Sequence, residues 1–346
     1  MKREYPAGVN YGEGLMKKLR LGVLGCSGHY ALRVAVPLQS SVLVEPYAVA
    51  SRDAVKAQNY AKTWGFARSY GSYEDLLADS GVDFVYIPLP NHLHLGYIKK
   101  AADAGKPVLC EKPLGLNAQE AAEAAEYCQK KGIPLMEAFM YRFHPQWIRA
   151  AEILKAGELG ILQSVSGFFS YTNKDPANIR NIAAYGGGAL LDIGCYTVSS
   201  ARLLMGKEPE QVVCTLVRDP VFHTDIFCSA LLDFGAGKTA LFTVGTQFFP
   251  YQRVSAFGTS GNLSIDVPFN MYGDVPGLIT VTTGIGKRLI ETRIGDQYLL
   301  EFNAFAESLI NNTAVPTPVS DAIANMAVLD ALFASAASGK WERVAK

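Results

Sequence analysis

A repeated alternation of short apolar runs with amphipathic segments, between residues 19 and 143, constrains the fold more than any other feature. The runs predicted as strands are Leu19–Gly25, Val44–Ala50, Asp83–Leu89, Pro107–Cys110 and Pro134–Tyr141. The segments predicted as helices are Ala31–Gln39, Ala54–Trp64, Tyr73–Ala78, His94–Ala104 and Ala118–Lys131. Strand–helix units of this length form a parallel sheet with helices on both faces, so residues 19–143 are predicted to be a doubly wound α/β domain.

After residue 144 strands outnumber helices. The predicted strands are Gln163–Tyr171, Gln211–Arg218, Ile226–Phe234, Thr239–Thr246, Arg253–Gly258, Leu263–Asp266, Leu278–Thr283 and Lys287–Ile294. The predicted helices are Gln146–Lys155, Ile193–Leu204, Gln297–Asn311 and Asp321–Ser338. This order predicts a second, α+β domain over residues 144–346, built on one open, predominantly antiparallel sheet. The last helix is expected to pack back on the first domain, and residues 1–18 to form a polar arm.

Composition narrows the class of protein. The 346 residues are 49% hydrophobic and 18% charged with zero formal net charge, which excludes the basic footprint of a nucleic-acid binder. No apolar run of membrane length and no signal core stands out, so a cytoplasmic protein without a membrane partner is expected. The cysteines form no CxxC pair and no histidine stands at zincin spacing, which predicts reduced thiols and no metal site.

The first strand runs into the sequence Gly25-Cys26-Ser27-Gly28-His29-Tyr30, and a helix follows. A glycine-rich turn between a strand and a helix is the setting of the Rossmann dinucleotide fingerprint, in which backbone N–H groups face the pyrophosphate. Ser27 and Tyr30 replace small residues of that fingerprint, so an ordinary turn is the alternative. The residues predicted to bind the cofactor here are Gly25, Ser27, Gly28, His29 and Tyr30.

The second strand ends in Ser51-Arg52-Asp53, with Lys56 one turn further on. An NAD enzyme usually carries an acidic residue there, which binds the ribose hydroxyls. Arginine, serine and lysine suit a 2′-phosphate instead, so NADP(H) is favoured over NAD(H). The alternative is that Arg52 is a solvated loop residue and that Asp53 only caps the next helix.

Three further segments carry polar groups suited to catalysis: residues 90–94, residues 111–113 and residues 186–196. Oxidising an alcohol requires a base for the hydroxyl proton while hydride leaves the adjacent carbon, and reduction requires the same group as an acid. Lys112 follows an apolar strand, at the sheet edge where such folds bind ligands. A partly buried lysine there can hydrogen-bond the reacting oxygen and favour ionisation of a neighbouring phenol, for which Tyr196 is the natural partner.

These segments, in this order and spacing, resemble the Gfo/Idh/MocA family of dehydrogenases. Residues 137–146 and 175–181 look like the subgroup that contains glucose–fructose oxidoreductase, NADP-dependent D-xylose dehydrogenase and dimeric dihydrodiol dehydrogenase. The resemblance runs from about residue 19 to the C-terminus. It implies that Tyr196 is the proton donor or acceptor, that Lys112 tunes and positions it, and that Asp192 orients the substrate.

Each of these residues also has a structural interpretation when taken alone: an exposed loop lysine, a core tyrosine and a helix-capping aspartate. The resemblance implies weaker roles for other positions. Further cofactor contacts are expected from Leu89, Pro90, Asn91, His94, Glu111, Lys112 and Arg142, and substrate contacts from Tyr171, Asp175, Arg180, Asp192 and Tyr196. A structural ion pair is the alternative for Arg142, and a cis peptide bond is implied before Pro113.

The expected function is NADP(H)-dependent hydride transfer to or from a sugar or polyol carbon, with aldose C1 favoured. Alternatives on the same fold are a trans-dihydrodiol, an anhydroketose or a keto-sugar nucleotide as substrate. A non-catalytic NADP-sensing protein is an alternative of another class. An apolar open sheet face would not stay exposed to solvent, so a homodimer or homotetramer formed through that face is expected.

Overall fold

The computed structural model describes residues 18–345, so apart from Lys18 the predicted N-terminal arm lies outside the described residues. Within this range the first sheet has six parallel strands in the order β3-β2-β1-β4-β5-β6. The strands are β1 (Leu19–Leu24), β2 (Val44–Ala50), β3 (Arg68–Tyr70), β4 (Phe84–Ile87), β5 (Val108–Glu111) and β6 (Leu135–Ala138). The predicted doubly wound parallel sheet is therefore confirmed.

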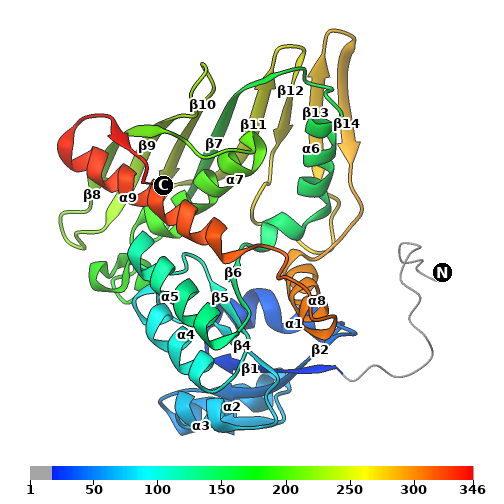
Figure 1. Cartoon of the computed structure of the whole chain (residues 1–346), viewed down its shortest axis with the longest axis vertical. Coiled ribbons are helices and arrows are strands. Elements are labelled where there is room, and N and C mark those ends of the chain that lie inside the picture. The colour runs from blue at the N-terminus through cyan, green and yellow to red at the C-terminus, as the bar shows by residue number, and fades with distance from the viewer. Residues whose placement is uncertain (1–17, 346) are drawn as a thin grey trace.

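Helices cover both faces of this sheet in Figure 1. They are α1 (Ala35–Leu38), α2 (Ala54–Trp64), α3 (Tyr73–Ala78), α4 (His94–Asp103), α5 (Ala118–Lys131) and, from the end of the chain, α8 (Gln297–Ile310). Local signals fix their ends. The Asn117 side chain accepts a hydrogen bond from the N–H of Glu120 at 2.9 Å at the start of α5, and Gly132 ends that helix at φ +67°.

The second sheet has nine strands within the described residues, in the order β14-β13-β12-β11-β7-β10-β9-β8-β15. They are β7 (Leu162–Thr172), β8 (Gln211–Arg218), β9 (Asp225–Asp233), β10 (Thr239–Gly245), β11 (Gln247–Gly258), β12 (Gly261–Ile265), β13 (Leu278–Thr283), β14 (Gly286–Glu291) and β15 (Glu342–Arg343). Only the β7–β10 pair is parallel, so the expected mostly antiparallel sheet is confirmed. One face carries α6 (Pro145–Lys155) and α7 (Cys195–Met205) (Figure 1).

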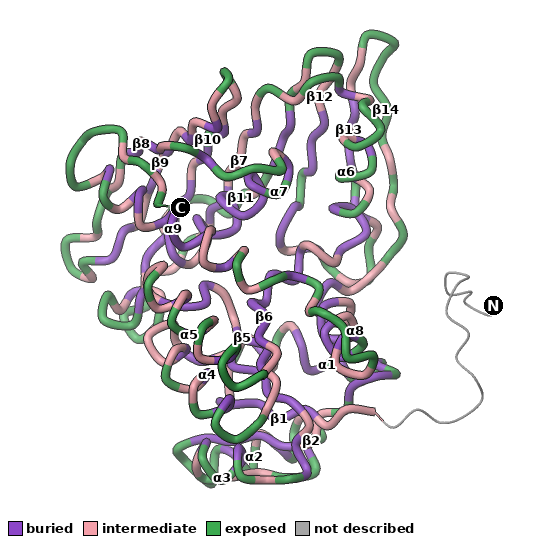
Figure 2. The backbone as a smooth tube through the Cα atoms, in the orientation of Figure 1, coloured by how far each residue is buried: buried purple, intermediate pink, exposed green. Residues whose placement is uncertain are grey.

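Burial alternates along the central strands of this sheet, as Figure 2 shows. In β10, Ala240, Phe242 and Val244 are buried under the helices, while Leu241 on the other face is 50% exposed. This alternation with period two separates a covered face from an open face.

The helix α9 (Val319–Ser338) packs on α5 of the first unit and on β8 of the second (Figure 1). By length and hydropathy alone this helix is apolar enough to cross a membrane, although the sequence predicted no apolar run of that length. Half of its most apolar window is buried inside the fold. The apolar side chains of α9 therefore pack between the two halves of the molecule.

Two short strands, β3 and β15, had no sequence signal, because neither is longer than three residues. The strand β11 begins at Gln247, six residues earlier than expected, although it contains Pro250. The hydroxyl of Ser170 on β7 donates a hydrogen bond to the carbonyl of Phe249 at 2.6 Å. Such side-chain hydrogen bonds replace the backbone hydrogen bonds between β7 and β11 where the register of β11 is irregular.

Candidate active site

A cavity of about 930 Å³ lies where the carboxyl ends of the parallel strands meet the helix-covered side of the second sheet. Its walls come from the β1–α1 turn, from the ends of β2, β4 and β5, from β7, and from the segment that leads into α7. Ligands of doubly wound folds bind at this edge of the sheet, because the strand ends and the helix N-termini converge there. The cavity is therefore the candidate site, and its two ends differ in construction.

The glycine turn forms one end, and Gly25, Ser27, Gly28 and His29 line it. Gly25 has φ +118°, and a Cβ there would lie 3.0 Å from the side chain of Leu89. The hydroxyl of Ser27 accepts a hydrogen bond from the N–H of Tyr30 at 3.1 Å and so caps the following helical turn. The turn thus keeps the open backbone that a pyrophosphate requires.

Ser51, Arg52 and Lys56 also line this end, as predicted. The side chain of Asp53 accepts a hydrogen bond from the N–H of Lys56 at 3.0 Å and caps α2. The carboxylate of Asp53, the first acidic residue after β2, therefore caps α2. The side chains that line the cavity at this point are one serine and two cations.

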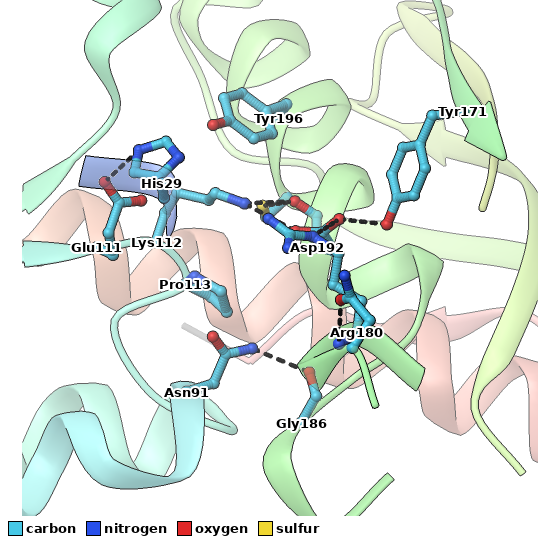
Figure 3. Close-up of polar contacts among 12 residues, drawn as sticks. His29, Asn91, Glu111, Lys112, Pro113, Tyr171, Arg180, Gly186, Asp192 and Tyr196 are labelled. Carbon is cyan, nitrogen blue, oxygen red and sulfur yellow. Dashed lines mark hydrogen bonds and ion pairs between the residues drawn. The ribbon is translucent and has the colours of Figure 1, made fainter. Parts of the chain in front are cut away.

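Glu111 and His29 meet at the wall between the two ends (Figure 3). The Nε2 atom of His29 lies 3.3 Å from Oε1 of Glu111, which also accepts a hydrogen bond of 2.5 Å from the hydroxyl of Tyr86. Burial alone would raise the pKa of Glu111, but the nearby His29, Lys112 and Tyr86 lower it to about 2. Glu111 is therefore ionised at neutral pH.

Lys112 is the next residue along the chain, and its side chain is only 9% exposed. Its ammonium group donates to the carbonyl of Asp192 at 2.7 Å and to Oδ1 of Asp192 at 3.2 Å. It also lies 4.7 Å from the centre of the Tyr196 ring. Burial works against the charge of Lys112, yet Asp192 raises its pKa above the ordinary value. The predicted cis peptide bond joins Lys112 to Pro113.

Asp192 is held by three elements at once (Figure 3). Besides Lys112, the Nε atom of Arg180 donates to Oδ2 at 2.9 Å, and the hydroxyl of Tyr171 donates to the same oxygen at 2.6 Å. Burial opposes ionisation of Asp192, but Arg180 and Lys112 hold its pKa well below the usual range. The carboxylate is therefore an ionised anchor for the cationic side chains around it.

Tyr196 lies beside Lys112, but its hydroxyl does not face the ammonium group. The hydroxyl donates to Sδ of Met140 at 3.5 Å, and the side chain is 5% exposed at the cavity wall. Burial raises the pKa of this phenol well above its ordinary value, and Tyr298 and Glu111 add to that. In this arrangement burial, rather than the nearby charge of Lys112, dominates the pKa of Tyr196.

The three glycines at 186, 187 and 188 precede Asp192. Gly186 and Gly187 do line the cavity, but Gly188, at φ +122°, packs against Asp225, and a Cβ there would clash with that carboxylate. Asp225 is buried, and its Oδ2 accepts a hydrogen bond of 2.6 Å from the N–H of Leu190. This contact caps the helical segment that carries Asp192 and Tyr196.

Three residues predicted to bind the cofactor lie away from the cavity lining. Tyr30 is fully buried and packs on Tyr60 and Phe66. A short π-helical segment, Tyr30–Val34, begins at this residue and turns its side chain into the core of the Rossmann domain. The side chain of Tyr30 therefore does not line the cavity, contrary to its predicted position.

His94 and Arg142 also have structural surroundings. The ring nitrogens of His94 lie 2.9 Å and 2.8 Å from the carbonyls of Pro113 and Leu89, so the fully buried ring ties two cavity loops together from behind. Arg142 pairs with Asp321 at 2.7 Å, which is the structural alternative raised for it. Neither side chain is among the lining residues of the cavity, contrary to the predicted position of both.

The remaining predicted residues do line the cavity: Leu89, Pro90, Asn91, Tyr171, Asp175 and Arg180. The amide of Asn91 donates to the carbonyl of Gly186 at 2.9 Å, which links the first unit to the loop after β7. Sequence reasoning missed several other lining residues, namely Arg33, Phe169, Asn173, Asn178, Tyr185, Asn270 and Tyr298. Tyr298 comes from α8 and Asn270 from an irregular segment, and neither lies in a motif.

Two models of known families match the chain. The oxidoreductase family with an NAD-binding Rossmann fold, Gfo/Idh/MocA, matches residues 19–139, and the C-terminal domain of the same family matches residues 147–264. The chain belongs to the Gfo/Idh/MocA family. It is accordingly an oxidoreductase with a Rossmann domain that binds a nicotinamide dinucleotide, as the motifs implied.

Relatives of known sequence or structure agree with this membership. An oxidoreductase of Rhizobium meliloti is 38% identical over 95% of this chain and 100% of its own length. A D-xylose 1-dehydrogenase (NADP⁺) of Haloferax volcanii is 38% identical over 93% of this chain and 98% of its own. The crystal structure of a 3-ketoreductase from Actinomadura kijaniata, in complex with NADP and TDP-benzene, has a TM-score of 0.88 at 29% identity and covers 92% of this chain and 98% of its own.

Solved forms of that ketoreductase include a lysine-to-alanine variant and a tyrosine-to-phenylalanine variant. The two substituted positions are separated by the same number of residues as Lys112 and Tyr196.

Among the described residues of this chain, no cluster of histidine, cysteine, aspartate and glutamate could hold a metal ion.

Proposed function

We propose that this enzyme uses NADP(H) to transfer hydride to or from a carbon of a sugar or polyol, with aldose C1 as the favoured position. The observation that carries the proposal is the meeting of Lys112, Asp192 and Tyr196 beside a cavity whose other end is the glycine turn. Nicotinamide C4 supplies or accepts the hydride when the cofactor is bound. The protein must then position the carbon and handle the proton.

The residues of the glycine turn fit a dinucleotide. Gly25 has a positive φ and lies close to Leu89, and a side chain at this position would prevent both. The backbone of the turn therefore lies at the cavity surface. Ser51, Arg52 and Lys56 would bind the 2′-phosphate, since charged donors and a hydroxyl suit phosphate oxygens. These features support NADP(H) over NAD(H).

At the other end, we assign the acid–base step to Tyr196. Its hydroxyl is held only by a thioether, which is a weak acceptor, so exchanging that contact for a substrate oxygen costs little. A phenol whose pKa is raised by burial stays protonated and can donate to the alkoxide that forms during reduction. In oxidation the same group first releases its own proton to solvent, and the phenolate then takes the hydroxyl proton of the substrate. Lys112 would hydrogen-bond the reacting oxygen, while Asp192, Arg180 and Tyr171 fix the position of its ammonium group and bind neighbouring hydroxyls.

A sugar-sized substrate fits the polar lining of this end, which includes Asn173, Asp175 and Asn178 besides the charged cluster. The D-xylose dehydrogenase relative supports an aldose, whereas the ketoreductase solved with TDP-benzene supports a keto-sugar nucleotide as the second candidate. Trans-dihydrodiols remain a third substrate class on the same fold.

The open face of the second sheet is proposed as the contact between subunits of a homodimer or homotetramer. Its outward side chains include Leu241, Phe249, Tyr251 and Leu289, and Phe249 is 84% exposed. Apolar surface of this kind gains about 25 cal/mol per Å² when it is covered. Light scattering of the purified protein should show a dimer or larger.

The reduced cysteines, all buried except Cys26, support a cytoplasmic location.

The test of function is a substrate panel with both cofactors. The full chain is assayed for reduction of NADP⁺ or NAD⁺ with D-xylose, D-glucose and a trans-dihydrodiol, and for oxidation of NADPH or NADH with keto-sugars. NADP⁺-dependent oxidation of an aldose supports the favoured assignment. Turnover of keto-sugar nucleotides alone would replace it with the second candidate. Tight NADPH binding with no turnover of any member would favour a sensor.

A further inference from the structure

The segment between β7 and α7 forms a small lobe at the substrate end of the cavity. This substrate lobe, residues 173–187, supplies lining residues along its whole length. The amide of the buried Asn181 donates to the carbonyl of Asp175 at 2.8 Å. The carbonyl of Arg180 accepts from the N–H of Gly188 at 2.9 Å. These internal hydrogen bonds make the lobe a compact unit in which Arg180 has a fixed place.

The tip of the substrate lobe lies against the Rossmann domain at a short helical turn, η2 (Asn91–Leu93), which follows β4. The ring of Tyr185 stacks on the ring of His92, with centres 4.3 Å apart and planes 18° apart. Beside the stack, the amide of Asn91 donates to the carbonyl of Gly186 at 2.9 Å (Figure 3). These two contacts join the lobe to the domain that carries the glycine turn.

His92 lies in the segment 90–94 that the sequence singled out, but no role has been assigned to it. Its Nδ1 atom is buried without a hydrogen-bond partner among the described residues. Packing on Tyr185 is therefore the interaction that the structure gives to this ring. Tyr185 itself is 37% exposed and lies at the cavity wall, so the stack holds a residue that the core does not enclose.

The position of the substrate lobe matters because the lobe carries Arg180. The guanidinium group of Arg180 donates to Asp192 at 2.9 Å, and Asp192 binds the ammonium group of Lys112. The side chains of Lys112 and Asp192 are only 9% and 12% exposed, so a substrate meets them in a nearly covered place. A shift of the lobe relative to the Rossmann domain would therefore change the geometry in which the substrate is held.

We propose that His92 and Tyr185 are positioning residues whose stack, with the bond from Asn91 to Gly186, forms a clasp that holds the substrate lobe closed over the substrate. This inference rests on the proposed function, because it takes this end of the cavity as the substrate end. Neither ring transfers a proton or a hydride. The clasp sets the fraction of molecules in which the lobe is in place before the substrate binds, and apparent substrate affinity falls with that fraction.

Removing the stack should therefore weaken substrate binding without slowing the chemical step. In Tyr185→Ala the KM for the sugar should rise about twofold to tenfold, the range expected for the loss of one aromatic pair. At saturating sugar the bound substrate itself favours the closed lobe, so kcat should stay within about twofold of the wild-type value. D-xylose with NADP⁺ is the probe, or the keto-sugar of the panel if only that is turned over.

Tyr185→Phe separates the clasp from a direct contact between the hydroxyl and the substrate. Its phenyl ring can still stack on His92, so this variant should keep the wild-type KM. His92→Phe should also keep it, whereas His92→Ala should match Tyr185→Ala. The double alanine variant should be no worse than either single variant, because both remove the same stack. Tyr272→Ala is the matched control, since Tyr272 is 65% exposed and lies outside the cavity lining.

Hydrogen exchange followed by mass spectrometry tests the clasp without turnover. In the full chain without ligands, the backbone amides of residues 173–187 should exchange about twofold to tenfold faster in Tyr185→Ala than in the wild-type chain. The reason is that loss of the stack raises the population of the open lobe. In Tyr185→Phe and Tyr272→Ala these amides should exchange at the wild-type rate.

An equal rise in KM in Tyr185→Phe and Tyr185→Ala would overturn the inference, because it would assign the effect to the hydroxyl. A fall in kcat at unchanged KM in Tyr185→Ala, or unchanged exchange of the lobe in that variant, would overturn it as well. If no substrate of the panel is turned over, the proposed function fails while the exchange experiment still decides the clasp. The two failures are therefore distinguishable.

Discussion

Three side chains from separate elements hold one buried carboxylate at the substrate end of the cavity, whereas the cofactor end presents an open backbone turn and exposed cationic side chains. Asp192 receives hydrogen bonds from Lys112, Arg180 and Tyr171, all between 2.6 and 3.2 Å for their side-chain contacts. Arg52 lies exposed at the rim of the other end. Buried, mutually neutralised groups hold a fixed geometry, and exposed cations attract charge without fixing it.

This difference predicts that substitutions at the two ends of the cavity affect different quantities, the turnover rate at one end and the affinity for the dinucleotide at the other. Changes at the substrate end should reduce the rate of the chemical step and leave dinucleotide binding nearly intact. Changes at the cofactor end should do the reverse. The substitutions below run from the largest expected effect on activity to the smallest.

Lys112→Met should have the largest effect. It removes the group assigned to the reacting oxygen and leaves the buried Asp192 with one cation fewer, so kcat should fall about 10³-fold or more. NADPH affinity, measured by fluorescence titration, should change less than about threefold, since the glycine turn is untouched. Lys99→Met, at an exposed lysine paired with Glu123, is the control. A loss of kcat below tenfold would remove Lys112 from the chemistry.

Tyr196→Phe should lower kcat by about 10²-fold to 10³-fold, the usual contribution of a positioned acid or base. Only a weak bond to Met140 is lost, so the melting temperature should hardly move. Tyr141→Phe makes the same change at a buried tyrosine that contacts the Tyr196 ring but bonds Ser199 instead. Equal activity of the Tyr196 variant and the wild-type chain would show that another group transfers the proton.

Arg180→Gln should act on substrate binding and on the placement of Asp192. A hydrogen bond between charged groups is worth about 1.5–3 kcal/mol, so kcat/KM should fall roughly tenfold to 100-fold. NADPH affinity should stay near the wild-type value. A variant whose main defect is in cofactor binding would contradict the division of the cavity into two ends.

Arg52→Gln addresses the cofactor end. Its charge-assisted contact with the 2′-phosphate should contribute about tenfold to NADPH affinity and nothing to NADH affinity. The ratio of the two dissociation constants therefore measures it, and the effect should shrink at high salt because the residue is exposed. An unchanged ratio would mean that Arg52 is a solvated loop residue.

Glu137→Gln should affect turnover least, because Glu137 lies behind the site, where it accepts a hydrogen bond of 2.8 Å from the N–H of Leu114. Burial, with Asp321, raises the pKa of Glu137 to about 7. A carboxyl group with a raised pKa contributes stability that is complete below about pH 4.5 and is lost as pH rises through about 7.

The free energy of unfolding of the wild-type chain should therefore fall, relative to Glu137→Gln, by up to roughly 3 kcal/mol between pH 4.5 and pH 8. Urea denaturation at several pH values measures this difference. Parallel curves for the two proteins would show that Glu137 is ionised in the fold at neutral pH.

The fold was predictable because its signals are local and repeated. Capping by Asn117 and Gly132, and the alternation of burial along β10, can be read from neighbouring residues alone. The meeting of Lys112, Asp192 and Tyr196 was predictable because these residues lie in motifs whose order is specific. Its internal geometry was not, because the direction of the Tyr196 hydroxyl depends on Met140, a residue with no motif of its own.

The departures from the predicted side-chain positions share one cause. Tyr30, His94 and Arg142 lie within or next to correct motifs, but a motif does not show which way a side chain turns. Tyr30 packs into the core, and His94 and Arg142 satisfy buried partners on the far side of the cavity loops. Tyr298 was missed for the opposite reason, because α8 returns to the first unit from late in the chain.

Single-turnover kinetics with an aldose deuterated at C1 test the central claim most directly. The full chain is premixed with NADP⁺ and mixed rapidly with the labelled or unlabelled sugar, while the absorbance of reduced nicotinamide is followed. We predict one equivalent of NADPH, slower formation with deuterium, and loss of formation in Tyr196→Phe at unchanged NADP⁺ affinity. Unchanged formation in both Tyr196→Phe and Lys112→Met, or no NADPH with any substrate of the panel despite bound cofactor, would contradict the account.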